Sequence, residues 1–98
     1  MGDSYEIEFP NAFTPNGDGL NDTFRPVYYG FKSVDLQVFD TWGTLIYSET
    51  AKGANIMNGW NGMLNGKPAT NGNYIFQVSG EAFNGETVLK NGPFTLLR

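Results

Sequence analysis

"NGNYIFQVSG", residues 71–80, is the stretch that decides the fold. It opens on Asn-Gly, a pair that tolerates the positive φ of tight turns. After this turn, every second residue is large and apolar: Tyr74, Phe76 and Val78. A period of two in aromatic and β-branched residues is typical of a strand with one buried face. The stretch therefore predicts a turn that is followed at once by a half-buried strand.

Short alternating runs between turn signals continue along the rest of the chain. They predict seven strands, at residues 5–9, 23–29, 34–40, 44–48, 73–80, 86–90 and 93–98. No segment has a sustained period of 3.6 residues, so we expect essentially no helix. Seven short strands in a chain of this length indicate an all-β fold, an immunoglobulin-like antiparallel β-sandwich.

The connections between these strands differ in kind. "DTWG", residues 40–43, and "NGE", residues 84–86, are predicted to be hairpin turns. Another Asn-Gly pair places a turn at residues 90–92, before the last strand. Residues 51–72 are rich in Gly, Asn and Pro and show no clear strand, so we expect a long ordered crossover that Trp60 pins to a sheet.

Length and composition exclude several classes of function. The 98 residues predict one domain, in which residues 1–4 are a linker and Met1-Gly2 looks like a start added to a piece of a longer chain. Ten acidic and six basic residues give a net charge of -4, which argues against nucleic acid and against anionic membrane surfaces. No apolar run approaches the roughly 18 residues that membrane insertion needs. Without Cys or His, the chain lacks disulfides, thiol chemistry and the usual general base.

One polar loop could hold a metal. In "NAFTPNGDGLNDTF", residues 11–24, the spacing of Asn16 and Asp18 resembles the centre of a calcium loop. The first and last acidic positions of that motif hold Thr14 and Arg25 instead. Calcium is the only cofactor that the sequence indicates, with candidate ligands Asn11, Asn16, Asp18 and Asp22. The alternative, which we favour, is that these side chains form Asx-turns that shape the loop.

Exposed aromatic residues could form a sugar-binding platform, and the candidates are Trp42, Trp60, Tyr28 and Tyr29. In a small sandwich, tryptophan is more often a core residue whose indole N–H is bonded to a carbonyl, so we expect both tryptophans in the core. Spacing brings no two carboxylates together as a glycosidase requires. We therefore expect a protein that is not an enzyme.

Four blocks in order resemble one family. They are "PNAFTPNGDGLNDTF", "LQVFDTWGTLIYSE", "GWNGMLNGKPATNGNYIFQV" and "GPFTLLR", and they cover about residues 9–98. Together they are similar to the gliding-motility-associated C-terminal domains, the type B sorting domains of type IX secretion cargo in Bacteroidota. The chain departs from the family at Thr41, where arginine is common, and at Asn61, where aspartate is common.

The resemblance implies an address rather than a catalyst. Such domains stand at the C-terminus of a parent protein, and the chain ends at Leu97-Arg98 as the family does. After Sec export, the type IX machinery reads them in the periplasm, and the parent then reaches the cell surface or the medium. We expect a monomer whose partners are the secretion machinery and the parent. The alternatives are a carbohydrate-binding or adhesive module and a structural spacer.

The resemblance also suggests roles for individual residues. We expect the terminal strand to lie near a sheet edge, where a partner can read it by strand addition or side-chain contact. The recognition candidates in this strand and the turn before it are Lys90, Asn91, Gly92, Thr95, Leu97 and Arg98. The structural candidates are Trp42, Gly43, Trp60, Gly62, Gly72 and Tyr74.

Overall fold

The computed structural model of the chain describes residues 5–15, 17, 22–53 and 57–98, and over these residues the protein is all-β without a helix. The strands of the described residues are β1 (Glu6–Glu8), β2 (Ala12–Phe13), β3 (Val27–Tyr29), β4 (Phe31–Phe39), β5 (Leu45–Lys52), β6 (Met63–Leu64), β7 (Lys67–Pro68), β8 (Gly72–Ala82) and β9 (Thr87–Leu96). The all-β prediction is confirmed.

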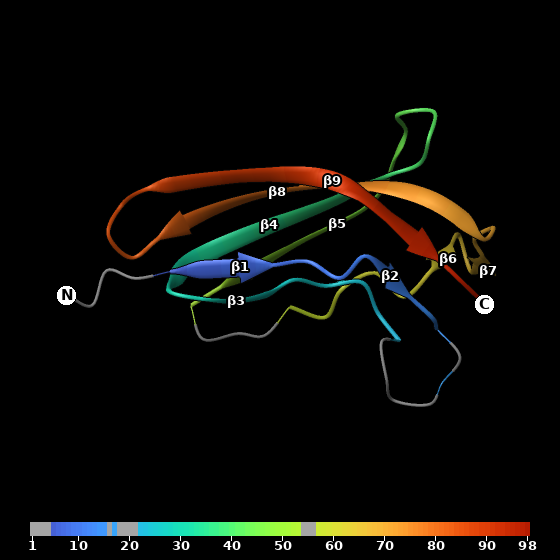
Figure 1. The fold of residues 1–98 in the computed structure, drawn as a ribbon, viewed down its shortest axis with the longest axis horizontal. Coiled ribbons are helices and arrows are strands. Elements are labelled where there is room, and N and C mark those ends of the chain that lie inside the picture. The colour runs from blue at the N-terminus through green and yellow to red at the C-terminus, as the bar shows by residue number, and fades with distance from the viewer. Residues whose placement is uncertain (1–4, 16, 18–21, 54–56) are drawn as a thin grey trace.

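A five-stranded sheet in the order β2-β9-β8-β4-β5 forms the larger layer (Figure 1). Its three long pairings, β4–β5, β4–β8 and β8–β9, are antiparallel, as expected. The short pairing of β2 with β9 is parallel. The predicted turns at residues 40–43 and 84–86 join β4 to β5 and β8 to β9, so both hairpin predictions are confirmed.

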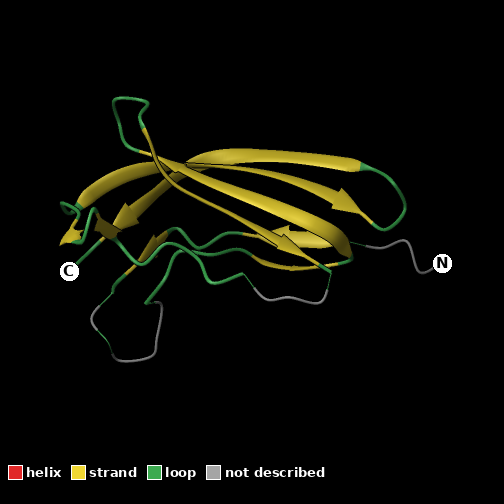
Figure 2. Ribbon diagram, turned by 180° about the vertical axis from the view of Figure 1, so that it is seen from behind, coloured by secondary structure: helices red, strands yellow, loops and turns green. Residues whose placement is uncertain are grey.

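Strands β1 and β3 pair antiparallel and form a second, smaller layer beneath the five-stranded sheet (Figures 1 and 2). The chain leaves β1 at Phe9-Pro10, and Pro10 has no N–H with which to continue the pairing. It then reaches the five-stranded sheet as β2. An immunoglobulin sandwich usually has about four strands in this second sheet. Here, among the described residues, the part of the chain around Trp60 makes one isolated bridge, with Phe24.

The core lies between the two layers. It consists of residues of β4, β5, β8 and β9 together with side chains from the segments that face them, namely Phe13, Phe24, Phe31, Val34, Leu36, Val38, Ala51, Met57, Trp60, Tyr74, Phe76, Val78, Phe94 and Leu96. The Tyr74 hydroxyl donates to the Thr70 carbonyl at 2.6 Å. A tyrosine near the start of this strand that bonds back to the upstream backbone is a hallmark of immunoglobulin-like sandwiches.

One predicted turn is wrong. The predicted strands 86–90 and 93–98 are not separated by a turn at Lys90, Asn91 and Gly92. The chain instead forms one strand, β9, from Thr87 to Leu96, which pairs with β8 without a register shift. Gly92 serves close packing instead of turning the chain. A side chain at Gly92 would meet the Phe76 ring at 3.2 Å, and that ring is stacked on Phe9 with centroids 4.1 Å apart.

The segment 51–72 is more structured than predicted. Strand β5 continues to Lys52, and the two-residue strands β6 and β7 pair as a small hairpin. Trp60 is fully buried and joins this segment to Phe24. Strands this short carry too few residues for alternation to show, which is why their sequences gave no strand signal. Over the part of the chain that the structure describes, no helix is long and apolar enough to cross a membrane.

Candidate recognition surface

A groove of about 760 Å³ lies at the end of the molecule where the chain terminates. We call it the C-terminal groove. One wall is the β4–β5 hairpin at residues 40–42, and the other is the segment 64–74, which contains β7 and the start of β8. Figures 1 and 2 show this hairpin projecting from the five-stranded sheet, on the side away from β1 and β3.

The hairpin that forms the first wall is built around the Asp40 carboxylate. Its Oδ1 accepts the N–H groups of Trp42 and Thr44, each at 2.9 Å. Gly43, at φ +84°, takes the positive φ that a side chain would disfavour. The backbone of this turn is therefore held by hydrogen bonds.

The prediction that Trp42 packs in the core is wrong. Its side chain is 90% exposed, at the tip of this hairpin, where it lines the groove. A tight turn extends beyond the last pair of the sheet, so a side chain at its centre has no facing layer to pack against. An indole held in solvent by a hydrogen-bonded turn is the kind of group that protein partners use as an anchor.

The last residues of the chain border the groove. The hydroxyl of Thr95 donates to Asn73 Oδ1 at 3.1 Å, and the N–H of Arg98 donates to Asn71 Oδ1 at 3.1 Å. Both asparagines line the groove. Leu97, which lies between Thr95 and Arg98 in the sequence, is half exposed. The structure thus brings three of the candidates from the terminal strand to one end of the molecule.

Arg98 is anchored at both its backbone and its side chain. Its guanidinium Nη2 donates a short hydrogen bond to the Gly62 carbonyl. Gly62 adopts φ +80°, and a side chain there would meet Arg98 Nη2 at 3.0 Å and Pro15 at 3.2 Å. A glycine is therefore needed at this contact, which fixes the chain terminus against the segment that follows Trp60.

Glu49 anchors the residues that come directly before Trp60. Its Oε2 accepts the Asn58 N–H at 2.8 Å, and its Oε1 accepts the Gly59 N–H at 2.8 Å and the Tyr47 hydroxyl at 2.7 Å. Burial would raise the pKa of Glu49, but these hydrogen bonds outweigh it and the pKa lies below its ordinary value. Burial and the bond to Glu49 raise the pKa of Tyr47.

This anchor makes stability depend on pH. A carboxylate whose pKa is lower in the folded state stabilises the fold above its unfolded pKa, and that contribution is lost as the pH falls through the folded value. We expect Glu49→Gln to lose less stability than the unchanged chain between neutral pH and about pH 3, below the ordinary glutamate pKa. Urea titrations across this range would measure it. The matched control is Glu6→Gln, which changes an exposed carboxylate on β1. An equal loss of unfolding free energy on acidification in the unchanged chain, Glu49→Gln and Glu6→Gln would contradict the prediction.

The loop that we considered as a calcium site is only partly within the described residues. Asn16 and Asp18 lie outside them, so the predicted ligand set has no described geometry. Of the others, Asn11 uses its carbonyl to accept the Thr95 N–H at 2.9 Å, and Asp22 Oδ1 accepts the Gly17 N–H at 3.0 Å. Over the described residues, no three acidic side chains gather as metal ligands.

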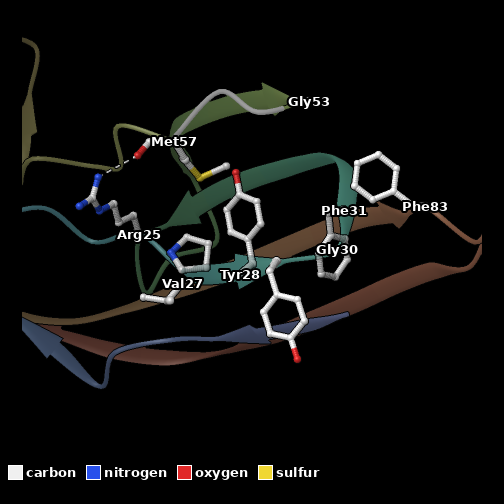
Figure 3. Close-up of a pocket in the computed structure, with 10 residues that line it drawn as sticks. Arg25, Val27, Tyr28, Gly30, Phe31, Gly53, Met57 and Phe83 are labelled. Atoms are coloured by element: carbon white, nitrogen blue, oxygen red, sulfur yellow. Dashed lines mark hydrogen bonds between the residues drawn. The ribbon is translucent and has the colours of Figure 1, made fainter. Parts of the chain in front are cut away.

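A second hollow, of about 530 Å³, lies beside β3 (Figure 3). Its lining is mainly apolar, with Val27, Tyr28 and Phe83 around it. The one charged residue in its described lining is Arg25, and the Arg25 guanidinium donates to the Met57 carbonyl at 3.2 Å. Burial, followed by the charge of Glu49, raises the pKa of Tyr28. This lining contains no pair of carboxylates for acid–base chemistry.

Comparison with protein families decides the class of the chain. The model of the CHU_C type IX secretion signal domain matches residues 7–95. The chain belongs to the CHU_C type IX secretion signal domain family. No curated protein and no solved structure matches it.

The family is one of sorting signals and not of catalysts, so the domain has a role in secretion, and the carbohydrate-binding alternative is not favoured. Export to the cell surface or medium, by a machinery that acts on a parent protein, follows from the family.

The motif blocks of this signal domain converge in space. Phe13 from the first block, Trp60 and Tyr74 from the third, and Phe94 from the last form one aromatic cluster, with Trp60 and Tyr74 centroids 5.0 Å apart. The second block provides the hairpin of Trp42. The groove is thus bordered by three of the four blocks, and the first block packs directly beneath them.

Sequence reasoning did not single out Asn71 and Asn73 of the signal domain. Both lie at Asn-Gly and Gly-Asn steps, where asparagine is sufficiently explained by the turn. Their role in holding Thr95 and Arg98 depends on the β8–β9 register, in which Asn73 faces Thr95. A signal for Trp42 was present, because a bulky aromatic residue at the centre of a four-residue turn is placed beyond the sheet.

Proposed function

We propose that residues 1–98 are a single, non-catalytic sorting domain that follows its parent protein in the chain. After Sec export, the type IX machinery reads the folded domain in the periplasm and carries the parent across the outer membrane. The match of the signal-domain model to residues 7–95 carries this proposal. A compact sandwich suits it, because a folded recognition domain can present several segments of the chain as one surface.

The surface that we propose for recognition is the C-terminal groove with the residues at its border. It offers the exposed Trp42 indole on one wall and half-exposed Leu97 near the other. Thr95 and Arg98 are each bonded to an asparagine of the lining, so the terminal residues are held in a fixed position before a partner arrives. A preorganised site binds with a smaller loss of conformational entropy, which supports a role in recognition. Lys90, Asn91 and Gly92 lie nearer the start of β9 and outside the described lining of this groove.

A reporter assay tests the sorting function. Residues 5–98 are fused behind a Sec-exported fluorescent protein in a Bacteroidota host with a working type IX system, and in an isogenic strain that lacks it. We expect the reporter at the surface or in the medium of the competent strain only. Retention in the periplasm of both strains, with the domain folded, would refute sorting by this chain.

The Trp42 side chain provides a prediction within this assay. Trp42→Ala should reduce export by about tenfold or more, since truncating a tryptophan that is a binding hot spot costs about 2 kcal/mol or above, roughly 30-fold in affinity. Its melting temperature should stay within about 3 °C of the unchanged domain, because surface substitutions usually change stability by less than about 0.5 kcal/mol.

The matched control is Val27→Ala on β3. Val27 is 75% exposed and lies outside the C-terminal groove. This variant removes an exposed apolar side chain and should be exported like the unchanged reporter. Equal export of Trp42→Ala and Val27→Ala would remove the hairpin from the recognition surface.

A further inference from the structure

The outer edge of β9 is largely uncovered. On one side, β9 pairs with β8 from Thr87 to Leu96. On the other side, its partner is β2, and that pairing consists of Ala12 with Thr95 and Phe13 with Leu96. The part of the chain that the structure describes places no strand beside β9 from Thr87 to Pro93.

The direction of the backbone groups on this edge follows from the bonds to β2. The N–H of Thr95 donates to the Asn11 carbonyl at 2.9 Å, and the N–H of Leu97 donates to the Phe13 carbonyl at 3.0 Å. Successive N–H groups of a strand point to opposite sides, and the β8–β9 register has no shift. Alternate residues toward the start of β9 therefore direct their N–H groups to the same open side, and these residues are Thr87, Leu89 and Asn91.

Pro93 supports this assignment. It occupies the next position in the same alternating set, where its missing N–H costs the sheet no bond to β8. At a neighbouring position it would have broken that pairing. Proline thus ends the open part of the edge, and the N–H and carbonyl groups available to a partner lie at Thr87–Asn91.

The open edge is also accessible. The Leu89 side chain is 70% exposed, and Thr87, Lys90 and Asn91 are exposed. Among the described strands, β1 does not fill the gap because it pairs with β3 in the other layer. The stacked rings of Phe9 and Phe76 hold the crossing from β1 to β2 between the layers.

We propose that the edge of β9 at Thr87–Asn91 binds an extended polypeptide segment of the secretion machinery by β-strand addition. This inference rests on the sorting function proposed above. An extended backbone is the ligand that satisfies donors and acceptors repeating every second residue. Leu89 favours an apolar side chain on the incoming strand, since side chains at neighbouring positions of adjacent strands pack together.

A second copy of the chain fits this edge less well. Each copy carries a net charge of -4, so self-association brings like charges together. In the two-fold antiparallel pairing of two β9 edges that is centred on Lys90, the two Lys90 side chains also face each other, and like charges at facing positions are destabilising. The charge of the chain therefore favours a different polypeptide as the incoming strand.

Proline and alanine substitutions at one site separate backbone pairing from side-chain contact. Asn91→Pro removes the outward N–H and places a ring there, whereas Asn91→Ala keeps the N–H. Asn91→Pro should reduce export of the reporter by about tenfold or more, because the partner strand can no longer form several of its backbone hydrogen bonds with β9. Asn91→Ala should export like the unchanged domain. Leu89→Pro and Leu89→Ala form a second matched pair.

The melting temperatures of the purified domains test the geometry independently. Asn91→Pro and Leu89→Pro should remain folded, as Pro93 does in the native strand, while Lys90→Pro should unfold because its N–H points toward β8. If both outward variants unfold, the assignment of the edge is wrong and the proposal fails. Normal export of the folded proline variants would also overturn the proposal. So would an equal loss of export for the proline and alanine variants at the same position.

Two further outcomes identify other failures. If the unchanged reporter is not exported, the sorting function itself is refuted, and strand addition to the machinery is refuted with it. Light scattering of the purified domain tests self-pairing. A dimer that Asn91→Pro converts to a monomer, together with normal export of that variant, would assign the edge to a second copy and overturn the proposed partner.

Discussion

Trp60→Ala is expected to destabilise the domain by about 3–5 kcal/mol, the range for deleting a large buried aromatic side chain. Trp60 is fully buried, with ring centroids 5.6 Å from Phe13 and 5.0 Å from Tyr74. Its indole N–H donates to the Met63 carbonyl at 3.0 Å. Alanine would leave both a cavity among these rings and an unpaired carbonyl. Because domains are stable by only about 5–15 kcal/mol, the loss is a large part of the total.

Thermal unfolding measures this effect, and Trp42→Ala is the matched control. Both variants delete an indole, but Trp42 is 90% exposed and its loss opens no cavity. Trp60→Ala should melt at least about 12 °C lower than the unchanged domain, from the 4–8 °C per kcal/mol that applies to domains of this size. Trp42→Ala should melt nearly as the unchanged domain does. Similar melting of the two variants would show that Trp60 does not support the core.

The two tryptophans also show how much about burial could be predicted from the sequence. Both are followed closely by glycine and lie near Asn or Asp, and the general preference of tryptophan for cores predicted burial for both. What separates them is the length of the connection. Trp42 stands in a four-residue turn beyond the sheet, whereas Trp60 stands in a long segment that folds back and pairs with Phe24.

Strands were predictable where alternation extends over many residues, as in β4 and β8. The prediction of a turn within β9 was wrong because an Asn-Gly pair occurs both in turns and in extended strands. At residues 84–85 it turns the chain, and Gly85 has φ +92°. At residues 91–92 it stays extended, and glycine makes room for the Phe76 ring. That second use depends on a residue from another strand, which local sequence does not reveal.

Part of the candidate site depends on contacts that are distant in sequence. Arg98 was predicted as a recognition candidate from its place in the motif, and its guanidinium is bonded to the carbonyl of Gly62, 36 residues earlier. Thr95 and Arg98 are held by asparagines that the β8–β9 pairing brings to them. The parallel pairing of β2 with β9 likewise results from the crossing between layers at Pro10. These features follow from topology, so alternation and turn signals did not predict them.

Gly59→Ala is expected to be the most damaging single-methyl change in the segment around Trp60. Gly59 has φ +86°, a region that costs a residue with a side chain about 1–3 kcal/mol. A Cβ here would also lie 2.7 Å from the Phe24 carbonyl oxygen and 2.8 Å from Arg25 Cβ. That carbonyl accepts the Trp60 N–H at 3.0 Å, so relieving the clash must displace the bridge that holds Trp60. The cost should therefore exceed the range for backbone strain alone.

Gly85→Ala separates the two contributions. Gly85 has φ +92°, close to that of Gly59, but a Cβ there meets nothing within 4 Å. In urea titrations with equal m-values, Gly85→Ala should lose only the backbone contribution, and the additional loss in Gly59→Ala measures the contact with Phe24. Gly59→Ala should also weaken the Glu49 anchor, because the Gly59 N–H donates to that carboxylate at 2.8 Å. Its stability should consequently fall less between neutral and acid pH than that of Gly85→Ala. Equal losses in the two variants would mean that Phe24 and Arg25 yield easily, and that the segment carrying Trp60 is held by the indole and not by its backbone.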